Sequence, residues 1–423
     1  MATPLQLDDG FALAILTPIA LGRTAALISH TGPKADPIGI QKKIAGCLEL
    51  FDQHQGLTEP KSIVPPEVML RRTLLIRALD IIGKVLNLEQ AIPTYGCVVE
   101  TDWTAHIELK KEKRYRDHII HPACVTAIGW WLLHLGLDPL VTRLAEHYKR
   151  VTEGYIRKFH FHLDDSDWPT LVENAWLAAG LLHDTGYPLE HHLRTGHQVQ
   201  AGFGDALGVV DLAAQRLASA PYRRVLLRRL RHSWFGAYSG LDLDSRLEAL
   251  RGHEYKKSHG ILGAIHQLLA LSSPHSAHGL MVQLAARAMV THHDEKDDDI
   301  LSDPLARLLA IADGLHAWRR PFVHRQASAT PSRRISFHTI IECERIVLVP
   351  QGKGYWARFQ MTGIPADRLA MRDSYAWRFD EFRKPNFRLE QLISQDGWLP
   401  PIVLTDRSCI QPASFRNLMN MPV

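Results

Sequence analysis

The sequence is poor in cysteine. Five cysteines are scattered singly over 423 residues, and none belongs to a CxxC pair. An odd number at such spacings indicates neither a disulfide framework nor a zinc ribbon. We therefore expect the protein to work in a reducing compartment, the cytoplasm.

Long apolar runs and a strong charge of one sign are also lacking. The first residues carry Asp8 and Asp9 where a secretory signal needs positive charge. The longest apolar run further along, 123–137, contains His134 and is shorter than the ~20 residues that cross a bilayer. The net charge of +4 does not by itself indicate a nucleic-acid or membrane binder. We expect no membrane partner.

Histidine, by contrast, is abundant. The chain has 24 histidines, more than its 10 tyrosines and 10 tryptophans together. Imidazole is the commonest metal ligand in proteins and the side chain that exchanges protons near neutral pH. The histidines are therefore the first place to look for chemistry.

The spacing of apolar residues predicts a mainly α fold with a small β-rich (α+β) extension at the C-terminal end. Residues 66–88 repeat apolar side chains at helical spacing, and nearly every segment of 123–318 has a helical pattern. The segments 335–341, 344–349 and 355–361 are typical of strands, with a glycine-containing turn at 351–354. We predict three parts: an N-terminal helical extension (1–110), a large helical domain (111–322) and a small β-rich C-terminal domain (335–423).

One buried helix is predicted to end in a His-Asp pair. Segment 171–182 is apolar almost all round, and it is followed by His183 and Asp184 before Gly186 interrupts the pattern. An imidazole and a carboxylate at the end of a rigid helix are a suitable platform for a divalent cation. The alternative is an ordinary helix end with a capping histidine and a solvated aspartate.

A second carboxylate is predicted on an apolar helix face. Asp303 is a natural N-cap and Pro304 suits the first helical position, so the phase of this helix places Asp313 among apolar residues. Such a carboxylate needs a cation. A metal ion is one candidate, and a salt bridge to Arg319 or Arg320 is the alternative.

Further histidines lie at helix ends. An apolar helix over 279–290 leads into His292 and His293, and His259 begins another helix. His121 stands at the entrance of an apolar helix, because the proline after it is tolerated only in a first turn. In chain order, the candidate metal ligands are His121, His183, Asp184, His259, His292, His293 and Asp313.

This order resembles the HD-domain superfamily of metal-dependent phosphohydrolases, whose pattern is H…HD…H…HH…D on a helical bundle. The resemblance covers roughly residues 117–321 and implies an HD-type helical bundle with two divalent transition metals. It implies that His121, His183, Asp184 and Asp313 hold the first ion. Asp184 would bridge to a second ion held by His259 and by His292 or His293. Imidazole and carboxylate ligands suit Mn, Fe, Co, Ni or Zn.

The resemblance also implies a reaction: a metal-activated water cleaves a phosphoester of a nucleotide or related substrate. The candidate catalytic residues are Asp184, His191 as general acid, and Arg194 as a cationic partner of the phosphate. The candidate substrate-binding residues are Tyr187, Lys296, Arg319 and Arg320. Tyr187 stands where some family members carry a lysine.

Three other functions stay open. An HD-type nuclease on single-stranded nucleic acid is favoured by the basic segments 223–231 and 319–334. An HD-type di-iron oxygenase would use a similar ligand pattern. A non-catalytic module would sense a nucleotide or bind a protein partner through its C-terminal domain.

Overall fold

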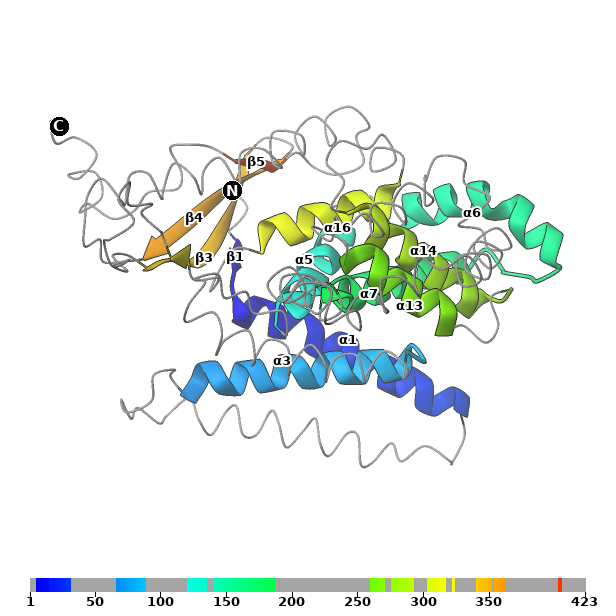
Figure 1. Cartoon of the computed structure of the whole chain (residues 1–423), viewed down its shortest axis with the longest axis horizontal. Coiled ribbons are helices and arrows are strands. Elements are labelled where there is room, and N and C mark those ends of the chain that lie inside the picture. Colours follow the sequence, from blue (N-terminus) through cyan, green and yellow to red (C-terminus); the bar gives the residue numbers. More distant parts are fainter. Residues whose placement is uncertain are drawn as a thin grey trace, which may run out of the picture.

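The structure is a computed structural model, and its described residues are 5–31, 66–88, 120–134, 140–187, 190, 259–270, 275–292, 303–316, 322–323, 340–351, 354–362 and 402–404. These residues are mostly helical, which confirms the predicted mainly α class (Figure 1). The helices are α1 (Asp9–Thr31), α3 (Pro66–Val85), α5 (His121–Leu133), α6 (Leu140–Phe159), α7 (Asp167–Leu182), α13 (His259–Ala270), α14 (Ala277–Thr291) and α16 (Pro304–Leu315). Across the ranges just given, no helix combines the length and apolarity needed to cross a membrane.

Helices α5 and α7 pack in close contact at the centre of the bundle. A Cβ at Gly129 would overlap the ring of Trp176, so glycine lets this indole lie directly on the α5 backbone. The indole Nε1 of Trp176 donates a hydrogen bond to the Thr126 carbonyl oxygen at 3.0 Å. The pair runs antiparallel, because the first residue of α5, His121, lies beside the C-cap of α7, His183, with ring centroids 5.0 Å apart.

Helices α13 and α14 bring a second pair of histidines together in the same way. His259 is the first residue of α13, His292 is the C-cap of α14, and their ring centroids are 5.8 Å apart. The predicted helix over 279–290 is confirmed and begins at Ala277, where the Ser276 side chain accepts a hydrogen bond from the Gly279 amide. Both helix pairs therefore place histidines at the same end of the bundle.

Asp303 links three helices. As predicted, it caps α16: its Oδ1 accepts hydrogen bonds from the amides of Leu305 at 3.0 Å and Ala306 at 3.1 Å. The hydroxyl of Tyr148 on α6 donates to the same oxygen at 2.8 Å, and Nε of the buried Arg287 on α14 donates to Oδ2 at 2.7 Å. Burial and the charge of Asp303 raise the pKa of Tyr148 well above its ordinary value.

The strands combine the two ends of the described chain. They are β1 (Leu5–Leu7), β2 (Phe322–Val323), β3 (Ile340–Gln351), β4 (Gly354–Thr362) and β5 (Ile402–Leu404). β3 pairs antiparallel with β1, β2 and β4, and β5 lies parallel to β4. Figure 1 shows β3 and β4 to one side of the helices.

The predicted strands 344–349 and 355–361 lie in β3 and β4, and β3 turns into β4 at the predicted position. The predicted interruption between 341 and 344 is wrong, because β3 continues through it with only a shift of register between Cys343 and Arg345. A β-bulge takes up the extra residue without ending the strand. Residues 335–339 lie outside the described residues.

We expect Asp303→Ala to lower the free energy of unfolding by about 3–5 kcal/mol, because it removes the cap of α16 and leaves the buried guanidinium of Arg287 without its carboxylate. Urea unfolding followed by circular dichroism measures this. The control is Asp165→Ala, which breaks an exposed ion pair with Lys149 and costs less than about 1 kcal/mol. Equal effects of the two substitutions would contradict the role given to Asp303.

Candidate metal centre

The candidate site lies where five helix ends meet. The N-terminal residues of α5 and α13 bring His121 and His259, and the C-terminal ends of α7, α14 and α16 bring the other candidate ligands. The last carbonyl groups of a helix carry partial negative charge, which favours a cation. Three C-terminal helix ends and two N-terminal ends meet here, so the partial negative charges outnumber the partial positive ones and favour a cation.

Two buried histidines, His121 and His183, and the partly exposed Asp313 form a group that could hold a metal ion. One ligand atom from each of these residues lies within 4.8 Å of the other two. The closest pair is His121 Nε2 and Asp313 Oδ1, at 2.7 Å. Each ligand comes from a different helix, so folding of the bundle creates the group.

The hydrogen bonding of the two ring nitrogens of His183 fits a metal ligand. Its Nδ1 lies 2.9 Å from the Gly180 carbonyl oxygen, which can only accept, so Nδ1 carries the proton and Nε2 the lone pair. Among the described residues, Nε2 is buried without a hydrogen-bond partner. Such an atom costs free energy unless a ligand binds it. A metal ion beside Asp313 and His121 would satisfy this requirement.

His292 is held in the same tautomer. Its Nδ1 donates to the Met289 carbonyl oxygen at 2.6 Å, so its lone pair also lies on Nε2. Burial is the main effect that lowers the pKa of His292 to about 3, with help from the positive charges that His183 and His259 carry when protonated. The side chain is therefore neutral at pH 7, the form that binds metals.

The carboxylate of Asp184 lies between the two pairs of histidines. Its Oδ2 is 3.7 Å from His121 Nε2, and its Oδ1 is 3.4 Å from His259 Nε2 and 3.6 Å from His183 Nε2. The side chain is only 7% exposed. Its two oxygens therefore face three of the candidate histidines.

His259 is held by Glu190, a residue that the sequence reasoning missed. Glu190 Oε2 accepts hydrogen bonds from the backbone amide of His259 at 2.7 Å and from its Nδ1 at 2.9 Å. Burial alone lowers the pKa of His259, but the hydrogen bond to Glu190 and the charges of Asp184, Glu190 and Asp313 outweigh it, so the pKa is raised. Only the spatial contact identifies Glu190, because its partner lies 69 residues away in the chain.

His316 was also missed. It is the C-cap of α16, three residues after Asp313, and its Nδ1 lies 2.6 Å from Nδ1 of His121. The two rings are stacked, with centroids 4.8 Å apart. One Nδ1 must donate and the other accept, so His316 fixes the ring of His121. Its place one helical turn after Asp313 was a usable signal in the sequence.

Two glycines allow these backbone segments to come together. A Cβ at Gly186 would overlap the His259 carbonyl oxygen and lie 2.6 Å from the Gly263 amide nitrogen. A Cβ at Gly260 would overlap the Met289 carbonyl oxygen and lie 3.1 Å from Cε1 of His292. The glycine after the His-Asp pair is therefore required by the contact between this turn and α13.

The structure brings together six of the predicted ligands: His121, His183, Asp184, His259, His292 and Asp313. Tyr187 lies at the partly exposed edge of this cluster, its ring centroid 6.3 Å from that of His259. The alternative predicted for Asp313 was a salt bridge to Arg319 or Arg320, which lie outside the described residues. Within the described residues, its carboxylate lies beside His121. Six predicted residues lie outside the described residues: His191, Arg194, His293, Lys296, Arg319 and Arg320.

Comparisons with protein-family models, curated proteins and solved structures give no match to this chain. The interpretation of the histidine–aspartate cluster therefore depends on its geometry and on the chemistry of its ligand atoms.

We expect Gly186→Ala to lower the free energy of unfolding by about 1–3 kcal/mol and to weaken metal binding, because the new methyl group pushes α13 and His259 away from Asp184. Equilibrium dialysis with Mn²⁺ and urea unfolding measure the two effects. Gly154→Ala on α6 is the control: nothing lies within 4 Å of its Cβ, so it stabilises the helix by up to about 1 kcal/mol. Normal metal binding by Gly186→Ala would contradict this account of the contact.

The lowered pKa of His292 predicts a dependence of stability on pH in the metal-free protein. Between pH 6.5 and about 3 the unfolded chain binds a proton that the folded His292 does not, so the free energy of unfolding falls as the pH falls. The slope due to this group is at most about 1.4 kcal/mol per pH unit. Urea unfolding between pH 7 and pH 4 measures it.

The variant for this test is His292→Gln, which should give a shallower decline than the wild type over the same range. Comparing the two removes the contribution of His259, whose raised pKa acts in the opposite direction. Substitution of the exposed His162 by Gln is the control and should leave the slope unchanged. Identical slopes for wild type and His292→Gln would show that His292 takes up its proton equally in the folded and unfolded protein, and so would contradict a lowered pKa.

Proposed function

We propose that this protein is a metal-dependent hydrolase of the HD type, a phosphohydrolase or phosphodiesterase that cleaves a phosphoester of a nucleotide or related substrate. One observation carries the proposal. In each of four histidines, Nδ1 has a hydrogen-bond partner, so Nε2 is the atom that each ring would offer to a metal; these are His121, His183, His259 and His292. Support of Nδ1 by a backbone carbonyl or a carboxylate, as in His183, His292 and His259, is the usual arrangement around protein metal ions.

We assign the ligands to two metal positions. His121, His183 and Asp313 form the first position, and His259 and His292 form the second. Asp184 would bridge the two, which its place between His121 and His259 supports. Divalent Mn, Fe, Co, Ni or Zn suits these ligands. When bound, such ions supply Lewis acidity that polarises a phosphoryl group and acidifies a water molecule.

The protein's own residues then set access and charge. Asp313 and His259 have side chains 22% and 12% exposed, while His121 and His183 are buried, so the substrate approaches from the side of Asp313 and His259. The ring of Tyr187 lies near that of His259, and its hydroxyl would donate to a phosphate oxygen in place of a lysine. The proposal also includes predicted residues that lie outside the described ranges. His191 would act as general acid, and four cationic side chains would contact the phosphate: Arg194, Lys296, Arg319 and Arg320.

The test is a screen of nucleotide and nucleic-acid phosphoesters with the purified protein and each candidate metal, next to elemental analysis. We expect Asp184→Ala to reduce metal-dependent hydrolysis below detection while circular dichroism stays that of the wild type, because the bridging carboxylate is lost and the helices remain. Substitution of the exposed Asp165 by Ala is the matched control and should keep full activity.

Two outcomes would contradict the proposal. Full hydrolytic activity of Asp184→Ala would show that the cluster does not carry the reaction. Uptake of oxygen by the iron-loaded protein, without cleavage of any phosphoester, would assign the site to an oxygenase instead.

A further inference from the structure

The four histidines obtain their Nδ1 partners in two different ways. His183 and His292 follow the last turns of α7 and α14, and each uses the carbonyl three residues earlier in its own helix, Gly180 and Met289. His259 and His121 are the first residues of α13 and α5. The Nδ1 partners of these two residues are side chains from other segments of the chain. For His259 that partner is Glu190.

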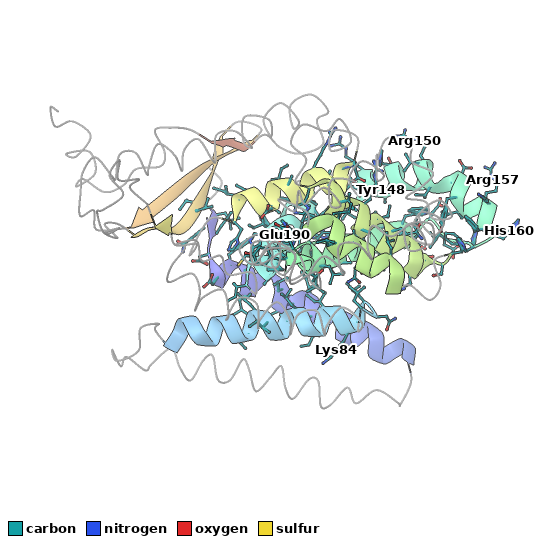
Figure 2. The ribbon with its side chains drawn as sticks, in the orientation of Figure 1. Lys84, Tyr148, Arg150, Arg157, His160 and Glu190 are labelled. Atoms are coloured by element: carbon teal, nitrogen blue, oxygen red, sulfur yellow. The ribbon has the colours of Figure 1, made fainter. Side chains whose placement is uncertain are left out.

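Both the backbone and the side chain of Glu190 are held by hydrogen bonds. Its backbone amide donates to the Gly186 carbonyl oxygen at 3.0 Å, which ties it to the turn that follows His183 and Asp184. Its side chain is 8% exposed, and one oxygen, Oε2, accepts from both the amide and Nδ1 of His259. Figure 2 shows Glu190 over the middle of the helical part, far from the outer end of α6 where Arg157 and His160 lie.

Two hydrogen bonds to one oxygen determine how the imidazole of His259 is turned. With its amide and Nδ1 both held, Nε2 of His259 is directed to Asp184, 3.4 Å away. A carboxylate partner also makes an imidazole a better metal ligand than a carbonyl does, and its negative charge is favourable at the N-terminal end of α13. Glu190 thus connects the turn that follows His183 and Asp184 to the imidazole of His259 on α13.

We propose that Glu190 is the positioning residue of the second metal position: by holding Nδ1 and the amide of His259 it keeps Nε2 of His259 aimed at the ion shared with Asp184 and His292. The first metal position does not depend on it. This inference rests on the proposed two-metal function and assigns to Glu190 a role separate from that of the ligands.

The experiment compares Glu190→Gln with wild type in the full-length protein, stripped of metal and titrated with Mn²⁺ in a calorimeter and with Co²⁺ by visible absorption. The amide oxygen of glutamine can still accept from the amide and Nδ1 of His259, but the negative charge that strengthens both hydrogen bonds is lost. We expect the first ion to bind as in wild type and the second to bind about 10–100-fold more weakly. The absorption band of the second Co²⁺ should change, and that of the first should not.

The matched control is Glu173→Gln. Glu173 also lies beside a histidine, His134 at 3.6 Å, but away from the cluster, so both ions should bind as in wild type. Glu190→Asp keeps the charge on a shorter side chain and should restore part of the affinity for the second ion. If Glu190→Gln does not fold, Glu190→Asp carries the same comparison, with the second ion alone weakened.

The outcomes separate the two proposals. If wild type binds two ions and Glu190→Gln binds both with unchanged affinity, the positioning role is overturned while the metal site stands. If Glu190→Gln weakens both ions equally, Glu190 supports the fold and not the second position, and the inference is overturned. If wild type binds no divalent metal, the proposed function fails and this inference fails with it.

Discussion

The close approach of three backbone segments is the constraint on which the candidate site depends. The turn after α7, the first turn of α13 and the last turn of α14 pass one another without intervening side chains, because Gly186 and Gly260 lie at the contacts. Only at this separation can imidazoles from different helices surround a single carboxylate. Small changes in the packing of these segments therefore alter the geometry of the ligands directly, since interiors this dense transmit displacement instead of absorbing it.

Collecting so many polar groups in a buried cluster opposes folding. Each imidazole or carboxylate that leaves water loses hydration, and the loss is recovered only where a partner is met. Two of the histidines find a partner within their own helix, where a backbone carbonyl accepts from Nδ1. His121 and His259 instead contact His316 and Glu190, which belong to other segments of the chain. The apolar contacts around Trp176 and the links through Asp303 supply the rigidity that keeps these pairs in register.

Local patterns in the sequence predict what local structure determines. The N-cap at Asp303 and the apolar helix before His183 could both be predicted, because each follows from residues within a few turns of one another. Glu190 and Arg287 could not, because their partners are defined by helix packing over 69 and 16 residues. The continuous strand β3 was missed for a related reason: pairing with β4 carries the ladder across a bulge that local pattern reads as a break.

The pairing of β1 with β3 has a consequence for how the protein is made. Leu5 lies opposite Leu348 in this ladder, so the partner of β1 is synthesised more than three hundred residues later. At about 5–20 residues per second, the N-terminal strand waits on the order of tens of seconds for it. Leu7, completely buried in the finished protein, lacks its neighbour Ile346 on β3 during that interval. The helices can assemble while the ribosome is still working, but the sheet closes last, and binding of a chaperone to the nascent N-terminus would compete with this final step.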